Sequence, residues 1–401
     1  MSANISLNDA QLFDNIPANH FLSVSECYGE GNLDNICDII CDNILDSCIK
    51  DDPNSQLSIS AAIKNNNVKL FGEISTIANV FYEQIVRKVL KDYGYDNKEK
   101  GLDYLSANVI TILEPIFFSN FAKDSSSNNE ILPENSGSFT GYASMEGEVD
   151  ILMPLSYMIA SKICMKIGEY RKSKEIPWLR SDCNCQVCIE YKKEENNIKP
   201  IRLQYIIINF GHEKNTNYED MKKLILEKVA KIIIPVELID EKSLIKINPL
   251  EVITGTQSIN DMGKSGKKGN SNSYGGWITA GSTHMNGKDY RKIERAAPLY
   301  CRYVAKSLVN NGLCQRVAVN VSYATHQKDP LCININTFNT SKKITEKEIS
   351  VIVKKNFDFS LKNIISELKL DKAIYTKIAM NGAYGFQDPD FTWEHPKKLE
   401  I

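Results

Sequence analysis

The sequence of 401 residues has little excess charge of either sign, since 48 Lys and Arg residues balance 50 Asp and Glu residues and leave a net charge of −2. A generic binder of nucleic acid or of an anionic membrane carries a basic surplus, so the composition argues against both partners. The hydrophobic (42%) and charged (24%) fractions are those of globular domains, which excludes wholesale disorder.

Long apolar runs are also absent. The longest, such as Ile206–Ile208 and Ile232–Ile234, fall far short of the roughly 20 residues that a membrane helix needs. The first twenty residues lack the basic and apolar regions of a secretory signal. The eleven cysteines are an odd number, and without an export signal they indicate reduced thiols. We therefore expect a cytoplasmic protein without a membrane anchor.

The hydrophobic periodicity predicts an α+β protein. Apolar residues at helical spacing predict helices at about 34–49, 77–93, 155–172, 218–233, 290–309, 345–357 and 359–368. Short apolar runs predict strands at 57–63, 68–74, 186–191, 202–210 and 317–324. This order is that of three similar α+β units in which helices cover one face of each sheet.

The same pattern divides the chain into five segments, whose spatial units we expect to interleave. They are a polar lead at 1–16, an N-terminal α+β region at 17–122, a Ser/Asn-rich loop at 123–137, a central α+β region at 138–250 and a C-terminal α+β region at 251–401.

A second polar segment, Gly263–Gly276 (GKSGKKGNSNSYGG), is rich in glycine and lysine, and we expect it to be a mobile loop. It lacks the G-x-x-x-x-G-K-[ST] spacing of a phosphate-binding P-loop and follows no clear buried strand. Two interpretations of this segment remain: a solvated basic loop, and a gating loop over a bound phosphate group.

Several segments resemble those of the S-adenosylmethionine synthetases (methionine adenosyltransferases), in family order and at nearly family spacing. They are Phe21–Asn35 (FLSVSECYGEGNLDN), Gly141–Glu148 (GYASMEGE), Ile176–Val187 (IPWLRSDCNCQV), Ser273–Trp277 (SYGGW), Gly287–Ala297 (GKDYRKIERAA), Arg302–Val309 (RYVAKSLV), Val321–Ala324 (VSYA) and Phe391–Leu399 (FTWEHPKKL). The last segment and RYVAKSLV are similar to the eukaryotic branch.

This resemblance implies three α+β domains related by pseudo-threefold symmetry. It also implies a dimer formed through flat sheet faces, with active sites at the subunit interface. In the family reaction, methionine sulfur attacks the ribose 5′ carbon of ATP and displaces triphosphate, which is then hydrolysed with the assistance of Mg²⁺ and K⁺.

The resemblance further implies a cationic shell around the departing triphosphate, where negative charge builds up in the transition state. The residues retained for ATP or triphosphate binding are Lys267, Lys268, Lys288, Lys292, Asp182 and Asp261. Lys267 replaces an arginine and lacks its planar fork. The candidate Mg²⁺ ligands are Glu26, Asp34, Asp289 and Glu294, and Glu294 replaces an aspartate, so its carboxylate lies one methylene further out.

Other expected site residues are missing. Asn32 stands where the family has a histidine that contacts the triphosphate, and Asn184 stands where it has a lysine beside the reacting centre. The Gly-Asp-Gln-Gly motif that helps hold methionine reads Glu134–Gly137 (ENSG), which removes a carboxylate. Ser60 replaces the glutamate that helps bind K⁺, which argues against this ion as a cofactor. Ile253 stands where an aromatic residue is expected to stack on adenine.

Removing one preorganised charged group typically costs ~3 kcal/mol of barrier, or about a hundredfold in rate. We therefore assign no catalytic residue and expect weak or absent catalysis. The leading hypothesis is a structural or regulatory subunit, either as a homodimer or as a heteromer with an active family member. Two alternatives remain open: an active enzyme with a rearranged site or altered substrate, and a phosphate or nucleotide sensor without turnover.

Two further patterns have a structural interpretation that we prefer to a functional one. Cys183, Cys185 and Cys188 (C-x-C-x-x-C) suggest zinc, but a strand places the first two on one face and the third on the other, and no second cluster follows. We therefore expect these three residues to be ordinary reduced cysteines and not zinc ligands. His212 and His284 are isolated, and we expect structural or surface roles for both.

Overall fold

The computed structural model describes residues 16–116, 130–195, 197–249, 261–281, 283–341 and 343–401. Most of the polar lead, the first part of the Ser/Asn-rich loop and Ile253 lie outside these ranges. Among the described residues, no helix is both long enough and apolar enough to cross a membrane.

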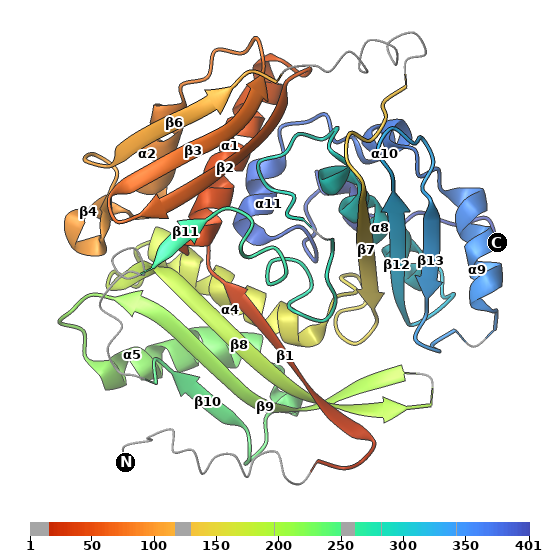
Figure 1. Ribbon diagram of the computed structural model, residues 1–401. Helices are drawn as coiled ribbons and strands as arrows, with labels where there is room; N and C mark the ends of the chain where they lie inside the picture. The colour runs from red at the N-terminus through yellow and green to blue at the C-terminus, as the bar shows by residue number, and fades with distance from the viewer. Residues whose placement is uncertain (1–15, 117–129, 196, 250–260, 282, 342) are drawn as a thin grey trace.

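Three sheets form the framework, and Figure 1 shows them arranged around the middle of the molecule. The N-terminal sheet has the order β11-β2-β3-β6, the central sheet β1-β8-β9-β10 and the C-terminal sheet β13-β12-β7. The strands are β1 (His20–Tyr28), β2 (Gln56–Lys64), β3 (Asn67–Ser75), β6 (Asn108–Glu114), β7 (Gly137–Ser144), β8 (Leu179–Glu194), β9 (Asn197–His212), β10 (Leu244–Ile247), β11 (Met262–Lys264), β12 (Arg316–Tyr323) and β13 (Cys332–Asn336), with a small pair of β4 (Asp96–Asn97) and β5 (Leu102–Asp103) apart from them.

One long helix packs against each sheet: α1 against β2, α4 against β8 and β1, and α8 against β7 and β12. The helices are α1 (Leu33–Asp51), α2 (Tyr82–Asp92), α4 (Leu155–Lys172), α5 (Tyr218–Ile225), α6 (Lys231–Ile233), α8 (Ile293–Asn310), α9 (Glu346–Asn356), α10 (Leu361–Leu368) and α11 (Tyr375–Asn381), and short 3₁₀ turns occupy Lys98–Lys100, Val236–Leu238 and Thr392–Glu394. The prediction of three similar α+β units is therefore confirmed.

Each sheet takes one strand from a distant part of the chain. β1 precedes α1 but pairs with β8 of the central sheet, β7 pairs with β12 of the C-terminal sheet, and β11 pairs with β2 of the N-terminal sheet. This cyclic exchange ties the three units together, because none of the sheets is complete without a strand from another unit.

Helix α1 forms the base of the N-terminal unit because its sequence combines a cap with a buried face. The side chain of Asn32 accepts a hydrogen bond from the Asp34 amide at the N-terminus, where helical amides lack partners. Ile36, Ile40 and Ile44 are fully buried. Burial of each such side chain stabilises the fold by ~1.5–3 kcal/mol, which makes α1 a rigid support.

The structure departs from the predicted elements in two respects. The helix predicted at 218–233 is interrupted by a π-helical turn at Leu226–Ala230, between α5 and α6. The sequence pattern also does not predict the strands β1, β4, β5, β6, β7, β10, β11 and β13 or the helix α11. All of these strands lie at sheet edges, where their pairing depends on tertiary contacts that a local pattern does not reveal.

Candidate functional site

A row of four aspartates on α1, of which the first three are buried and the fourth is half-buried, positions the segments around the candidate site. The acids recur at every fourth residue, which places them on one face of the helix. Each accepts a hydrogen bond from a backbone amide: Lys264 N to Asp34 Oδ1 (2.9 Å), Gly266 N to Asp38 Oδ1 (2.7 Å), Gly287 N to Asp42 Oδ1 (2.8 Å) and Tyr375 N to Asp46 Oδ1 (2.9 Å). The sequence analysis missed this row, although its spacing is visible in DNICDIICDNILD.

Burial shapes the charge of this row. Loss of solvation raises the pKa of the Asp38 carboxyl well above its usual range, and the pKa of Asp42 is raised for the same reason, against the opposing effect of Arg295. The Arg295 guanidinium pairs with Asp42 at 2.5 Å, and both side chains are fully buried. Asp42 thus joins α8 to α1 through one buried ion pair and holds the loop before α8 through the Gly287 amide.

The segment Gly263–Gly276 is not the mobile loop that its composition predicts. It begins in β11, continues through hydrogen-bonded turns and places the fully buried Tyr274 against Tyr384, with ring centroids 4.7 Å apart. Gly266 adopts a φ of +77°, and a Cβ there would lie 2.3 Å from the His284 ring. Among the described residues between the loop and α8 no helix occurs, so the loop is not a P-loop.

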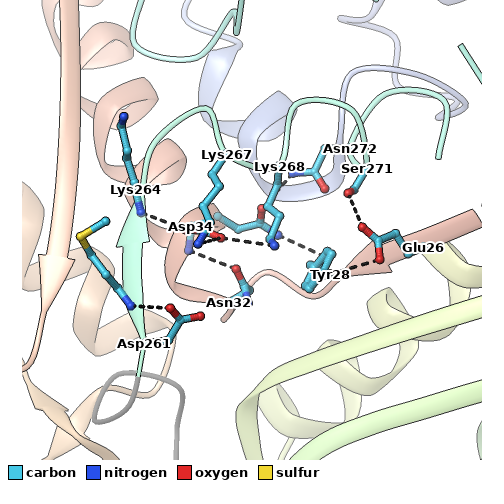
Figure 2. Close-up of polar contacts among 12 residues, drawn as sticks. Glu26, Tyr28, Asn32, Asp34, Asp261, Lys264, Lys267, Lys268, Ser271 and Asn272 are labelled. Carbon is cyan, nitrogen blue, oxygen red and sulfur yellow. Dashed lines mark hydrogen bonds and ion pairs between the residues drawn. The ribbon is translucent and has the colours of Figure 1, made fainter. Parts of the chain in front are cut away.

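Two lysines of this loop lie beside the first acid of α1, as Figure 2 shows. Lys267 Nζ is 3.7 Å and Lys268 Nζ is 3.4 Å from Asp34 Oδ2. Lys268 Nζ also lies 3.7 Å from the centroid of the Tyr28 ring, a cation–π contact. Burial and the neighbouring Glu26 raise the pKa of Tyr28 to about 12, so the phenol stays protonated at neutral pH.

Asn32, at the first position where a family cation is expected, bonds to one acid and to the helix that it caps. Its Nδ2 donates to Asp182 Oδ1 at 3.3 Å, while its Oδ1 caps α1. Burial raises the pKa of Asp182 to about 6, and the hydrogen bond from Asn32 and the charge of Lys268 oppose that rise. A neutral amide thus bridges α1 and β8 at the position where a cation is expected.

The second position, Asn184, lies on β8 directly opposite Tyr28 of β1. Its Oδ1 accepts a hydrogen bond from Asn209 Nδ2 at 2.9 Å, across the β8–β9 pair. An amide pair therefore occupies the place expected for a lysine. Lys268 lies over the ring of Tyr28, the strand neighbour of Asn184.

The remaining lysines of the predicted shell gather at the start of α8. Lys288 Nζ lies 3.3 Å from Glu294 Oε1, and Lys292 forms a short ion pair with Glu134. Asn135 Nδ2 donates to the same Glu294 oxygen at 2.9 Å. The other oxygen, Glu294 Oε2, is buried without a hydrogen-bond partner in the described part of the chain.

Three of the predicted acids have other contacts. Asp289 is fully buried, and its two oxygens accept from the amides of Leu57 and Arg291. Glu26 accepts hydrogen bonds from Ser271 and Tyr28. Asp261 is exposed and accepts from the amide of the next residue.

A cavity of about 540 Å³ lies between three parts of the chain: the segment Gly263–Gly276, which we call the lysine-rich loop, the loop that precedes α8, and the helix α11. Lys267, Lys288 and His284 line its polar part, and Ile378 and Ala379 line an apolar part. Burial and the charge of Lys288 lower the pKa of His284 to about 4, so the ring is neutral at neutral pH. His284, for which the sequence predicts a structural or surface role, thus lines the cavity.

Over the described residues, no group of three or more His, Cys, Asp or Glu side chains is arranged to hold a metal ion. All eleven cysteines are free thiols, including Cys183, Cys185 and Cys188. His212 is buried, with Nδ1 2.9 Å from the Glu213 carbonyl oxygen, which fits the structural role expected for it.

Comparison with known protein families assigns nearly the whole described chain. Residues 20–116 match the S-adenosylmethionine synthetase N-terminal domain, residues 131–252 the central domain and residues 254–395 the C-terminal domain. The three matches follow one another in chain order, and the three α+β units of the structure accord with them. The chain belongs to the S-adenosylmethionine synthetase family.

Proposed function

We propose that this chain is a catalytically impaired S-adenosylmethionine synthetase homologue that acts as a structural or regulatory subunit of a synthetase-like dimer. The observation that carries the proposal is the state of the two positions where the family has a cation. Asn32 bonds to Asp182 and Asn184 bonds to Asn209, so neither position supplies positive charge. Two such losses in one site reduce the stabilisation of a departing triphosphate, although their effects are not additive.

The retained lysines support binding of polyphosphate more than turnover. Lys267 and Lys288 line the cavity, where their charges attract ATP or triphosphate. Carboxylates of the chain partly neutralise these charges, since Asp34 lies near Lys267 and Glu294 near Lys288. A weakened shell of this kind holds an anion without providing the extra stabilisation that a transition state requires.

Magnesium fits this site only as a companion of the phosphates. Family members generally use Mg²⁺ and K⁺. Mg²⁺ is commonly held by one or two carboxylates together with substrate phosphates. Glu294 Oε2 is the donor best suited to this, because it is buried and without a partner among the described residues, whereas Asp289 uses both oxygens on backbone amides. The ion would neutralise phosphate charge beside Lys288. Ser60, on β2, offers no carboxylate to K⁺.

The outer faces of the sheets support assembly. Val24 on β1, Phe71 on β3, Ile112 on β6 and Met262 on β11 are exposed large hydrophobic residues. Phe71 and Ile112 are directly opposed across the β3–β6 pair, so they form one apolar surface. Contiguous exposed apolar residues mark interaction surfaces. We expect this side to meet a second copy of the chain or an active family member.

One observation favours the alternative, an active methionine adenosyltransferase with a rearranged site. Lys268 lies over Tyr28, the strand neighbour of Asn184, and beside Asp34, which follows Asn32 by two residues. A single amine that serves both positions would restore part of the missing charge.

A turnover assay separates the two functions. The purified chain is incubated with ATP, methionine, Mg²⁺ and K⁺, alone and mixed with an active family member, and S-adenosylmethionine is quantified. If the chain is a structural or regulatory subunit, it forms no significant S-adenosylmethionine alone. In the mixture, it changes the rate of product formation or the stability of the active family member. Robust product from the chain alone would support the alternative.

A further inference from the structure

In the segment just before β7, the carboxylate of Glu134 contacts Lys292, one of the lysines predicted to bind triphosphate. Glu134 pairs with Lys292, which lies at the N-terminal cap of α8. The next residue, Asn135, donates to Glu294 in the first turn of the same helix. Two consecutive side chains therefore fix this segment to the lysine-bearing end of α8.

The two partners of the ion pair differ in exposure. The side chain of Lys292 is 10% exposed, whereas that of Glu134 is 51% exposed. Glu134 thus covers the amine from the solvent side. Because the exposed partner can turn into water at little cost while the buried one is held, Glu134 is the side chain that moves when the pair opens.

We propose that Glu134 is an internal competitor that occupies the anion position on Lys292 and lowers the affinity of the site for polyphosphate. This inference rests on the proposed function, since it concerns the same lysine shell. An incoming phosphate oxygen and the Glu134 carboxylate seek the same amine and repel each other, so binding requires the Glu134–Lys292 pair to open first.

The competition is tested with Glu134→Gln, which removes the charge and keeps the size of a half-exposed side chain. Inorganic triphosphate, with and without Mg²⁺, is titrated into the full-length protein by calorimetry at low salt. We expect the variant to bind about fivefold more tightly than the unmodified chain, the size of effect that opening one partly exposed ion pair has. The gain shrinks at 0.5 M salt, because ions screen the pair.

A matched control is available four residues upstream. Glu130 pairs with Lys328 at 2.9 Å on the surface, and Glu130→Gln removes the same charge from the same segment. This control separates a local competition at Lys292 from a general loss of negative charge. A second control, Glu134→Gln in a Lys292→Met background, asks whether the gain acts through Lys292. We expect no gain in either control.

The outcomes distinguish this inference from the proposed function. Tighter binding by Glu134→Gln alone supports the competition. Equal binding by the unmodified chain and by both Gln variants overturns the competition and leaves polyphosphate binding intact. Equal gains in Glu134→Gln and Glu130→Gln overturn it in favour of a long-range charge effect. Absence of binding by every variant overturns both the competition and the polyphosphate-binding part of the proposed function.

Discussion

Asn32 Nδ2 donates a hydrogen bond to Asp182 Oδ1 at 3.3 Å, and this contact joins the start of α1 to β8. In this family a histidine is expected at position 32, where it would meet the triphosphate. The asparagine instead caps its own helix and bridges to an acid. Asn32 therefore makes structural contacts at the position where a charged side chain is expected.

Asp182 makes the stability of the fold depend on pH in a defined direction. Its pKa is raised from 3.8 to about 6 in the folded state, mainly by burial, so the folded state binds more protons than the unfolded state between these values. The free energy of unfolding therefore falls as pH rises from about 4 to about 6. Asp182→Asn should flatten this part of the profile, measured by urea denaturation at several pH values. An unchanged slope in the variant would contradict the prediction.

The buried pair of Asp42 and Arg295 should be among the most sensitive positions in the chain. Asp42→Asn leaves the fully buried guanidinium without a counter-charge, and we expect a loss of ~3–5 kcal/mol in the free energy of unfolding. The control is Asp92→Asn, which breaks an exposed pair with Lys88 on α2 and should cost less than ~1 kcal/mol. Similar losses in the two variants would refute the role given to Asp42.

Asp38 should determine how well the lysine-rich loop is ordered. Asp38→Ala removes the acceptor of the Gly266 amide, so we expect faster hydrogen exchange at Gly266 and a loss of ~1–3 kcal/mol. Asp46→Ala is the matched control, because Asp46 shares this face of α1 with Asp38 but accepts from the amides of Tyr375 and Thr376 of α11 instead. Exchange at Gly266 that is equally fast in both variants would mean that Asp38 does not hold the loop.

Restoring the family cations should restore part of the chemistry. The double variant Asn32→His with Asn184→Lys returns a histidine and a lysine to the positions expected to meet the triphosphate. We expect turnover at least tenfold above that of the unmodified chain, since each charged group is worth about a hundredfold in a complete site. Asn32→His with Asn209→Lys is the control, because it puts the same charge on the neighbouring strand. An equal rise in both would indicate a general effect of charge.

Most of the long elements can be predicted from the sequence, because apolar residues recur at helical spacing in each long helix. Helix α4 was predicted at its observed residues, and α1, β2 and β3 within one or two residues. The exchange of β1, β7 and β11 between sheets was beyond local patterns, because β11 has only three residues and is stabilised by pairing with β2. The π-helical turn after α5 was missed for a similar reason, since no breaking residue marks it.

The site was less predictable than the fold. Family-like segments identified the lysines, but composition alone suggested that Gly263–Gly276 is mobile. Its order comes from the buried Asp38 and Tyr274, which act through contacts with distant residues. The partners of the lysines were equally hidden, because Glu134 and Lys292 are far apart in sequence. Sequence reasoning could name the charges but not their pairing.

We infer that the amides at positions 32 and 184 leave a departing triphosphate without adequate positive charge. The most direct test measures S-adenosylmethionine formed by the purified chain alone at saturating ATP, methionine, Mg²⁺ and K⁺, beside an active family member under the same conditions. We expect a rate at least about a hundredfold below that of the active enzyme. A rate comparable to the active enzyme would contradict it and would point to Lys268 as the replacement cation.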